Sequence, residues 1–189
     1  MTMRVLLRWM EWIAVPAAAG LACSLLSLGV VTWLPALAAA AQVLQRWRSD
    51  GDQRAFVGVF GAFGAQWRSL WRHSLISTAI GVVLLANLTF LAGRTGVAFV
   101  FFAVQLGLAA AFLTYHLALA AAAGRRDAFA RQTAVKLAFG KYGVLLLLAT
   151  VLAVLLTAPL GIGPLLFGPS LPLLLALAFL DRPIPTPER

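Results

Sequence analysis

The sequence predicts an all-α, polytopic membrane helical bundle, and three observations carry that prediction. The 189 residues are 62% hydrophobic and only 11% charged, whereas a soluble domain carries roughly 25% charged residues. The apolar residues occur in long runs, several of them near the roughly 20 residues that cross a bilayer as a helix. The basic residues fall almost entirely between these runs, which is the pattern that sets membrane topology. We therefore expect a single membrane domain over residues 1–189.

The first quarter of the chain predicts an interfacial N-terminus at 1–12 followed by a helical hairpin at 13–48. The apolar run 13–34 is long enough to cross the bilayer. We expect Pro35 to end it and the short segment 36–47 to return through the membrane. Alternatively, 36–47 extends the first helix out of the membrane. The first interpretation gives six membrane limbs and the second gives five spans.

The rest of the chain predicts an alternation of interfacial helices and hairpins. Residues 55–73 and 125–142 mix basic with aromatic or aliphatic side chains, as expected of amphipathic helices that lie in the membrane interface. Residues 74–123 and 143–180 are apolar and each contains one turn, so each predicts a hairpin of two spans. A polar, proline-rich tail occupies 181–189. The favoured architecture is three hairpins, the first with a short return limb, joined by two basic cytoplasmic interfacial helices.

The distribution of positive charge predicts which side faces the cytoplasm. With six limbs, both termini and both interfacial helices share one side, and of the 15 Lys and Arg residues only Arg94 lies opposite. With five spans, Arg4 and Arg8 join Arg94 on the outer side. Because Lys- and Arg-rich connectors stay in the cytoplasm, the six-limb arrangement is favoured. We expect a multi-pass protein of the bacterial cytoplasmic membrane with both termini cytoplasmic.

The basic connectors are expected to contact anionic inner-leaflet lipid or a partner protein. Aromatic side chains recur every three or four residues along 55–73, which places them in one stripe on a helix. Each nearby basic residue contributes about 1 kcal/mol of attraction to an anionic surface. Membrane topology also accounts for the net charge of +9, so we expect no nucleic-acid partner. The residues expected to face lipid or a partner are Arg46, Arg48, Phe56, Phe60, Phe63, Trp67, Arg68, Trp71, Arg72, Arg125, Arg126, Arg131, Lys136 and Lys141.

The sequence contains no recognisable catalytic, cofactor-binding or metal-binding constellation. The Asp and Glu residues lie outside the expected spans. Ion-coupled transporters usually need carboxylates inside the membrane. No glycine-rich loop with a lysine is present to bind a nucleotide. Cys23 has no second cysteine, and His73 and His116 have no further ligands at metal-binding spacing. We therefore expect no cofactor, no metal and no enzymatic activity.

A few polar residues fall inside the expected spans, namely Asn87, Thr89, Gln105 and His116. In a tight hairpin the depths of Asn87 and Gln105 differ by about one helical turn, so their side chains could meet. They form either interhelical hydrogen bonds, worth about 0.6 kcal/mol each, or contacts with a bound or transported ligand. A shared cavity lined by Asn87, Thr89, Gln105 and Thr157 would favour the ligand.

Three adjoining features distinguish residues 28–71. The stretch 28–40 (LGVVTWLPALAAA) is an apolar run with a proline–alanine turn, 46–52 (RWRSDGD) is a basic helix end with an acidic turn, and 55–60 (AFVGVF) begins the aromatic segment. This combination resembles the YesL family of small bacterial membrane proteins, although Leu34 stands where that family often has glycine. The resemblance implies an accessory role in carbohydrate uptake, with components of ABC-type sugar transporters as partners.

Two functions from different classes are compatible with these observations. The favoured one is a non-enzymatic accessory or scaffold protein associated with solute transport, which docks partners or anionic lipid through its basic aromatic helices. The alternative is a small-ligand-binding membrane subunit or transporter. A six-helix protein of this size resembles the substrate-binding subunits of energy-coupling-factor transporters. A membrane enzyme is disfavoured because acids and histidines do not converge in the sequence.

Overall fold

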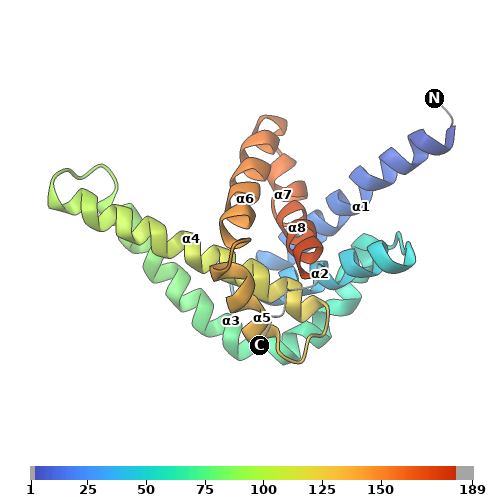
Figure 1. The fold of residues 1–189 in the computed structure, drawn as a ribbon, viewed down its shortest axis with the longest axis horizontal. Coiled ribbons are helices and arrows are strands. Elements are labelled where there is room, and N and C mark those ends of the chain that lie inside the picture. Colours follow the sequence, from blue (N-terminus) through green and yellow to red (C-terminus); the bar gives the residue numbers. More distant parts are fainter. Residues whose placement is uncertain (1–2, 182–189) are drawn as a thin grey trace, which may run out of the picture.

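The computed structural model describes residues 3–181, and every regular element within them is helical (Figure 1). Five segments are long and apolar enough to cross a membrane: Trp9–Ser27, Ala55–Leu91, Val97–Gly124, Gly143–Leu160 and Gly163–Leu180. The expected all-α membrane bundle is therefore confirmed. The elements are α1 (Met3–Ser27), α2 (Trp33–Asp50), α3 (Ala55–Leu91), α4 (Val97–Gly124), α5 (Ala130–Phe139), α6 (Gly143–Thr157), the 3₁₀ helix η1 (Ala158–Leu160), α7 (Gly163–Phe167) and α8 (Ser170–Leu180).

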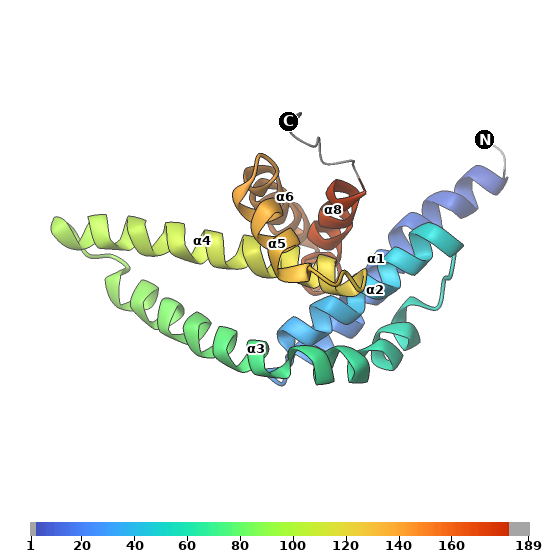
Figure 2. The same cartoon turned by 60° about the horizontal axis from the view of Figure 1, so that its bottom comes forward.

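Three antiparallel helix pairs build the bundle. Near the start of α1 the ring of Trp12 lies 4.9 Å from that of Trp47, which is near the end of α2. In the same way, Tyr142 before α6 stacks on Phe179 near the end of α8, with ring centroids 4.6 Å apart. The helices α3 and α4 lie side by side toward the turn that joins them (Figure 2). The far end of this pair projects away from the other hairpins, and most of its apolar side chains are exposed.

The helix α2 returns alongside α1, so it is a return limb and not an extension of the first helix. The expectation that Pro35 ends the first helix is wrong, because α1 already ends at Ser27 and the turn occupies 28–32. Pro35 lies in the first turn of α2, where its missing N–H would have had no helical acceptor. The Thr32 hydroxyl closes the turn by donating to the carbonyl of Leu26.

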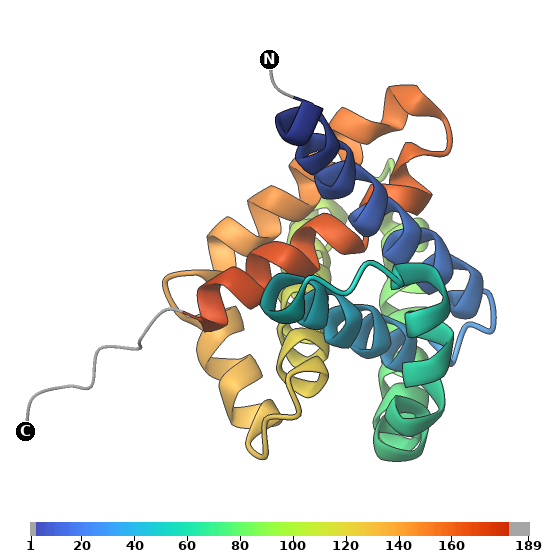
Figure 3. The same ribbon diagram turned by 90° about the vertical axis from the view of Figure 1, so that its right-hand side faces the viewer.

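The helix α2 is also the centre of the bundle. Its residues 34–44 are all buried, and it packs against α1, α3, α4 and α8. Figure 3 shows α1, α8 and the start of α3 around it. Alanine at 36, 38, 39, 40 and 41 has no exposed surface, and such small side chains allow helix backbones to approach closely. Because neighbouring helices enclose α2, it need not be apolar enough to face lipid.

Two expected boundaries between interfacial and membrane-spanning segments are absent. The segments 55–73 and 74–91 form one continuous helix, α3, which bends along its length (Figure 2). The segment 1–12 is likewise not separate, since α1 runs unbroken from Met3 through the buried Pro16. Charge and hydropathy change at these points, but backbone hydrogen bonding does not require a break there. The change of environment therefore occurs within a helix.

The C-terminal half also differs in detail from the expected limits. The helix expected at 125–142 covers only Ala130–Phe139, because 125–129 forms a structured turn after α4. The last hairpin contains two short helices, η1 and α7, where an uncharged turn was expected. Of the expected tail, Asp181 follows α8, and residues 182–189 lie outside the described part of the chain.

One carboxylate joins the C-terminal ends of the three returning helices. Asp181, which follows α8, contacts the guanidinium of Arg48 near the end of α2 at 2.7 Å. It also contacts the guanidinium of Arg125, which follows α4, at 2.6 Å. Exposed ion pairs of this kind contribute only about 0–1 kcal/mol each, so the contact matters mainly for placement. It shows that α2, α4 and α8 all end on the same side of the bundle.

The crossing of α2 and α4 requires a glycine, and this can be tested with a matched pair of substitutions. A Cβ on Gly124 would lie 2.7 Å from both the Ala41 Cβ and the Gln42 amide nitrogen, whereas a Cβ on Gly107 would meet nothing within 4 Å. We expect Gly124→Ala to lower the free energy of unfolding by about 1–3 kcal/mol. Gly107→Ala, on the same helix, should leave it unchanged or raise it by up to about 1 kcal/mol. Unfolding by sodium dodecyl sulfate in mixed micelles measures both, and equal effects would contradict the close crossing.

Candidate functional site

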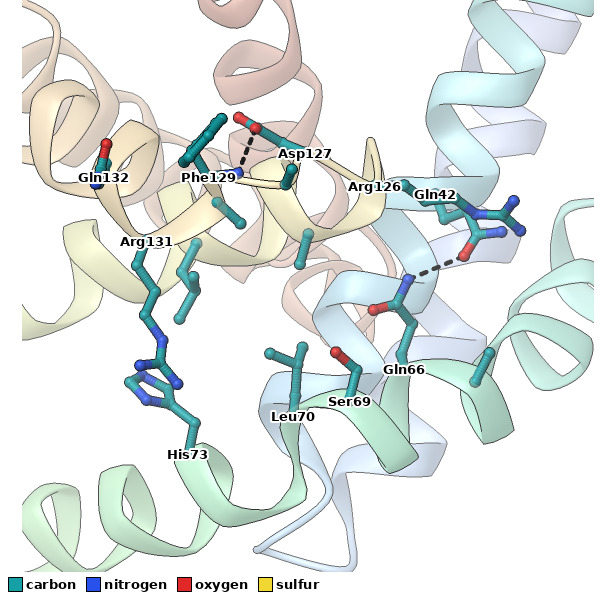
Figure 4. Close-up of a pocket in the computed structure, with 15 residues that line it drawn as sticks. Gln42, Gln66, Ser69, Leu70, His73, Arg126, Asp127, Phe129, Arg131 and Gln132 are labelled. Carbon is teal, nitrogen blue, oxygen red and sulfur yellow. Dashed lines mark hydrogen bonds between the residues drawn. The ribbon is translucent and has the colours of Figure 1, made fainter.

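A polar pocket of about 580 Å³ lies between α2, α3, the end of α4 and the linker that leads into α5. Its volume falls within the roughly 300–1,000 Å³ that is typical of small-molecule sites. The side chains drawn in Figure 4 come from all of these segments. The polar and charged members of the lining are Gln42, Gln66, Ser69, His73, Arg126, Asp127, Arg131 and Gln132.

The linker reaches the pocket because α4 ends in an αL turn. The Arg126 N–H donates to the carbonyl of Ala123 at 2.9 Å, and the Asp127 N–H donates to that of Ala122 at 3.2 Å. These two bonds define a Schellman cap, whose left-handed residue is usually glycine. Here that residue is Arg126, with φ of 59°, and a side chain in this conformation costs about 1 kcal/mol or more. The turn brings the Arg126 side chain close to Gln42 at the pocket (Figure 4).

Asp127 is the acid of the pocket lining, but its carboxylate is occupied by its own linker. One oxygen accepts the Phe129 N–H at 2.8 Å and the other accepts the Thr133 hydroxyl at 2.6 Å. The hydrogen bond from the Thr133 hydroxyl, and to a lesser extent the one from the Phe129 N–H, holds the pKa of Asp127 below its ordinary value. The carboxylate therefore fixes the start of α5 through these two bonds.

The wall formed by α3 adds amide, hydroxyl and imidazole groups. The side-chain amide of Gln66 donates to the side-chain oxygen, Oε1, of the buried Gln42 at 3.0 Å. Ser69 and His73 follow along the same face of α3, and the guanidinium of Arg131 lies beside the His73 ring (Figure 4). The Nε2 atom of His73 is buried and has no hydrogen-bond partner among residues 3–181. The pocket therefore concentrates hydrogen-bonding groups and positive charge.

A second polar cluster lies in the interior between α3 and α4. The two ring nitrogens of His116 lie 2.7 Å from the Ser77 hydroxyl and 2.7 Å from the carbonyl of Phe112. The ring centroids of His116 and His73 are 5.7 Å apart, a proximity that their sequence separation does not reveal. Within the described residues no group of three His, Cys, Asp or Glu side chains could hold a metal ion. This cluster ties α3 to α4.

The other polar residues expected inside the spans do not bond to one another in the described part of the chain. Asn87 and Thr89 are exposed on α3, and the Thr89 hydroxyl bonds to the Ala86 carbonyl of its own helix. Gln105 makes no hydrogen bond to Asn87, and its Oε1 atom is buried without a partner in the described chain. Thr157 bonds to Ala153 on α6. The expected meeting of Asn87 and Gln105 is therefore absent.

The basic connector residues have three different placements. All of them are exposed; Arg48 and Arg125 bind Asp181, Arg126 and Arg131 line the polar pocket, and the others do neither. The aromatic stripe is partly exposed: Phe56, Phe60 and Trp71 are 39–42% exposed, while Phe63 and Trp67 are half-buried. The neighbouring stripe of α3 (Ala55, Val59, Ala62 and Gln66) is buried instead.

Sequence reasoning missed the pocket residues Gln42, Gln66, Ser69 and Gln132, and it considered His73 only to reject it as a metal ligand. Gln42 stands out as a polar side chain inside an alanine-rich stretch, whereas Ser69, His73 and Gln132 each lie next to an arginine. Neither signal shows which of these residues meet.

The pH dependence of stability tests the cap formed by Asp127. A carboxyl whose pKa is lower in the folded chain stabilises it above the ordinary pKa, and this contribution is lost as the pH falls through the lowered value. We expect Asp127→Asn to reduce the thermal midpoint at neutral pH. The gap between the two proteins should shrink below about pH 4. Thermal unfolding across this pH range measures it, and a gap independent of pH would contradict the cap.

The interior bond between Ser77 and His116 gives a second test of the site. Ser77→Ala leaves the buried Nε2 of His116 without its partner, so the free energy of unfolding should fall by about 1 kcal/mol. Thr89→Ala removes an exposed hydroxyl that bonds only within its own helix, and it should change stability by less than about 0.5 kcal/mol. Unfolding in mixed micelles compares the two, and equal values would contradict a structural role for His116.

Comparison with known proteins gives one match. The model of a family described as "Protein of unknown function, DUF624" matches residues 13–88, from α1 into α3, which is less than half of the chain. YesL-like proteins belong to that family. The resemblance noted over 28–71 lies within the matched segment. No curated protein and no solved structure matches the chain. The chain is therefore similar to the DUF624 family over its first hairpin and most of α3.

Proposed function

We propose that this protein is a non-enzymatic accessory subunit of a solute-transport system, which docks a cytoplasmic-side partner through the aromatic and basic face of α3. The solute class, carbohydrate, and the ABC-type partner rest on the resemblance to the YesL family. The docking role rests on one observation: the aromatic stripe of α3 is partly exposed beside the exposed side chains of Arg68 and Arg72.

The first half of α3 has two faces with different roles. Its buried face packs on α2, and the approach is close at Gly58, where a Cβ would lie 3.2 Å from a Val43 methyl. Its other face carries Phe60 and Trp71, together with the exposed Arg68 and Arg72. Aromatic and Arg side chains are enriched in the buried centres of protein interfaces. Such a face suits a partner with acidic and apolar side chains.

The placement of the other polar residues also supports an accessory role. A carrier needs polar groups that face a pathway within the membrane. Asn87 and Thr89 instead face outward, and Thr157 bonds to its own helix. The site with converging polar groups lies at the end of the bundle where Asp181 joins the returning helices. By the distribution of basic residues, we assign that end to the cytoplasm.

Site-specific photo-crosslinking in native membranes tests the docking role. A benzoylphenylalanine at Phe60, on the proposed docking face, is compared with one at Phe101, which is exposed on the far part of α4. We expect the first position to crosslink to a permease or ATPase subunit and the second to give no protein adduct. Arg68→Glu with Arg72→Glu should reduce the adduct severalfold, because charge complementarity favours encounter.

Two outcomes would contradict the proposal. The same adducts at Phe60 and Phe101 would show non-specific proximity in the membrane. A protein adduct at Phe60 that contains no component of a transport system would assign the face to another partner.

A further inference from the structure

We propose that the membrane-embedded half of α3 forms a parallel homodimer, in which the side-chain amide of Asn87 in one copy hydrogen-bonds to the same amide in a second copy. This inference goes beyond the docking role and does not depend on it, because the docking face lies on the first half of α3 and the dimer contact on the second. Three features support it: an exposed amide, the stripe of side chains around it, and the orientation that two copies share in a membrane.

Asn87 exposes an amide at a depth where lipid offers it no hydrogen-bond partner. It lies six residues before Gly93, which corresponds to about 9 Å along the helix axis. Its side chain is exposed and makes no hydrogen bond within residues 3–181, whereas the Thr89 hydroxyl bonds to a carbonyl of its own helix. Asparagine is too short to reach the headgroups as lysine and arginine do. Polar side chains inside membranes nearly always face other helices, so Asn87 indicates that another helix covers this face.

The side chains around Asn87 have the spacing of a helix–helix seam. The stripe repeats at intervals of 4, 3 and 4 residues, and all of its members are exposed: Ile76, Ile80, Val83 and Asn87. Side chains that repeat every 3.5 residues pack two helices along a shallow left-handed crossing, and a single asparagine in such a seam sets the register. The stripe lies about a quarter turn around the helix axis from Gly81, where α3 meets α4. It is therefore not covered by α4.

A second copy of the chain is the partner that fits this amide. All copies of one chain insert into the membrane in the same orientation, so two copies lie parallel and are related by a two-fold axis along the membrane normal. Each residue on the stripe then meets the same residue of the other copy at the same depth. A primary amide both donates and accepts. Two Asn87 side chains therefore satisfy each other, which an apolar partner helix would not do.

The shape of the molecule leaves the stripe accessible to a neighbouring hairpin. The far end of the α3–α4 pair projects away from the other hairpins (Figure 2), and the side chains of Ile76 and Val83 are 62% and 59% exposed. A parallel dimer also brings the docking faces of both copies to the same side of the membrane.

Cysteine crosslinking in native membranes tests which face of α3 meets a second copy. Val83→Cys lies in the stripe. Val82→Cys, at the next position and on another face, is the matched control, because the two valines are 59% and 57% exposed. Oxidation with copper phenanthroline should give a disulfide-linked dimer severalfold more often for Val83→Cys, since a disulfide needs Cβ atoms about 4 Å apart. The parent chain, whose Cys23 is buried, gives the background.

Substitutions at Asn87 test the hydrogen bond itself. The dimer fraction of the purified full-length chain in phosphatidylglycerol-containing liposomes is measured by single-molecule photobleaching over a range of protein-to-lipid ratios. Asn87→Leu should weaken association about three- to tenfold, and Asn87→Gln should restore part of the loss because it keeps the amide. Thr89→Val removes an exposed hydroxyl that bonds within its own helix, and it should change association by less than about twofold. All three variants should keep the thermal midpoint of the monomer.

Three results would overturn the proposal. The parent chain stays monomeric at high protein-to-lipid ratios, Val82→Cys and Val83→Cys crosslink equally, or Val83→Cys is joined mainly to a different protein in native membranes. The last result would assign the stripe to another membrane protein. Photo-crosslinking from Phe60 is measured separately in the Asn87→Leu variant, so failure of the dimer is distinguishable from failure of the docking role.

Discussion

The close packing of the alanine-rich helix α2 inside a ring of other helices is the constraint on which this structure depends. In lipid, helices gain little from burying apolar surface and associate mainly through close contact and hydrogen bonds. The residues 34–44 of α2 are buried on every side, and Gly124 brings α4 against Ala41. Larger side chains at these positions would separate α2 from its neighbours and remove the contacts that position everything else.

The pocket is a direct consequence of that packing. Gln42 belongs to α2 and meets Gln66 of α3 because the two helices are in contact. The end of α4 lies against the same part of α2, so its cap places Arg126 at the pocket. The linker fixed by Asp127 then brings Arg131 to His73. The small residues at the helix crossings thus hold the helices together, and the polar residues next to these crossings form the site.

Particular elements show which features local sequence reveals. The apolar runs predicted the helices, since a chain in lipid must satisfy its backbone groups within the helix. Local sequence did not place the end of α1, because Pro35 is as acceptable in the first turn of a new helix as after the end of an old one. Local sequence also predicted a boundary at residue 73, where charged side chains give way to apolar ones, but the helix α3 continues through this point. Arg126 and Arg131 were identified as surface groups, without the neighbours that make them part of a pocket.

The sequence by itself determined that this is a helical membrane protein with basic connectors, because hydropathy and charge act on each segment separately against the solvent around it. Only the tertiary structure decided that α2 returns and lies at the centre, that His73 approaches His116, and that Gln42, Gln66 and Arg126 share one pocket. These features depend on which helices are in contact and on where along each helix the contact lies. Contacts between residues far apart in the chain follow from packing of the whole bundle, which no single segment encodes.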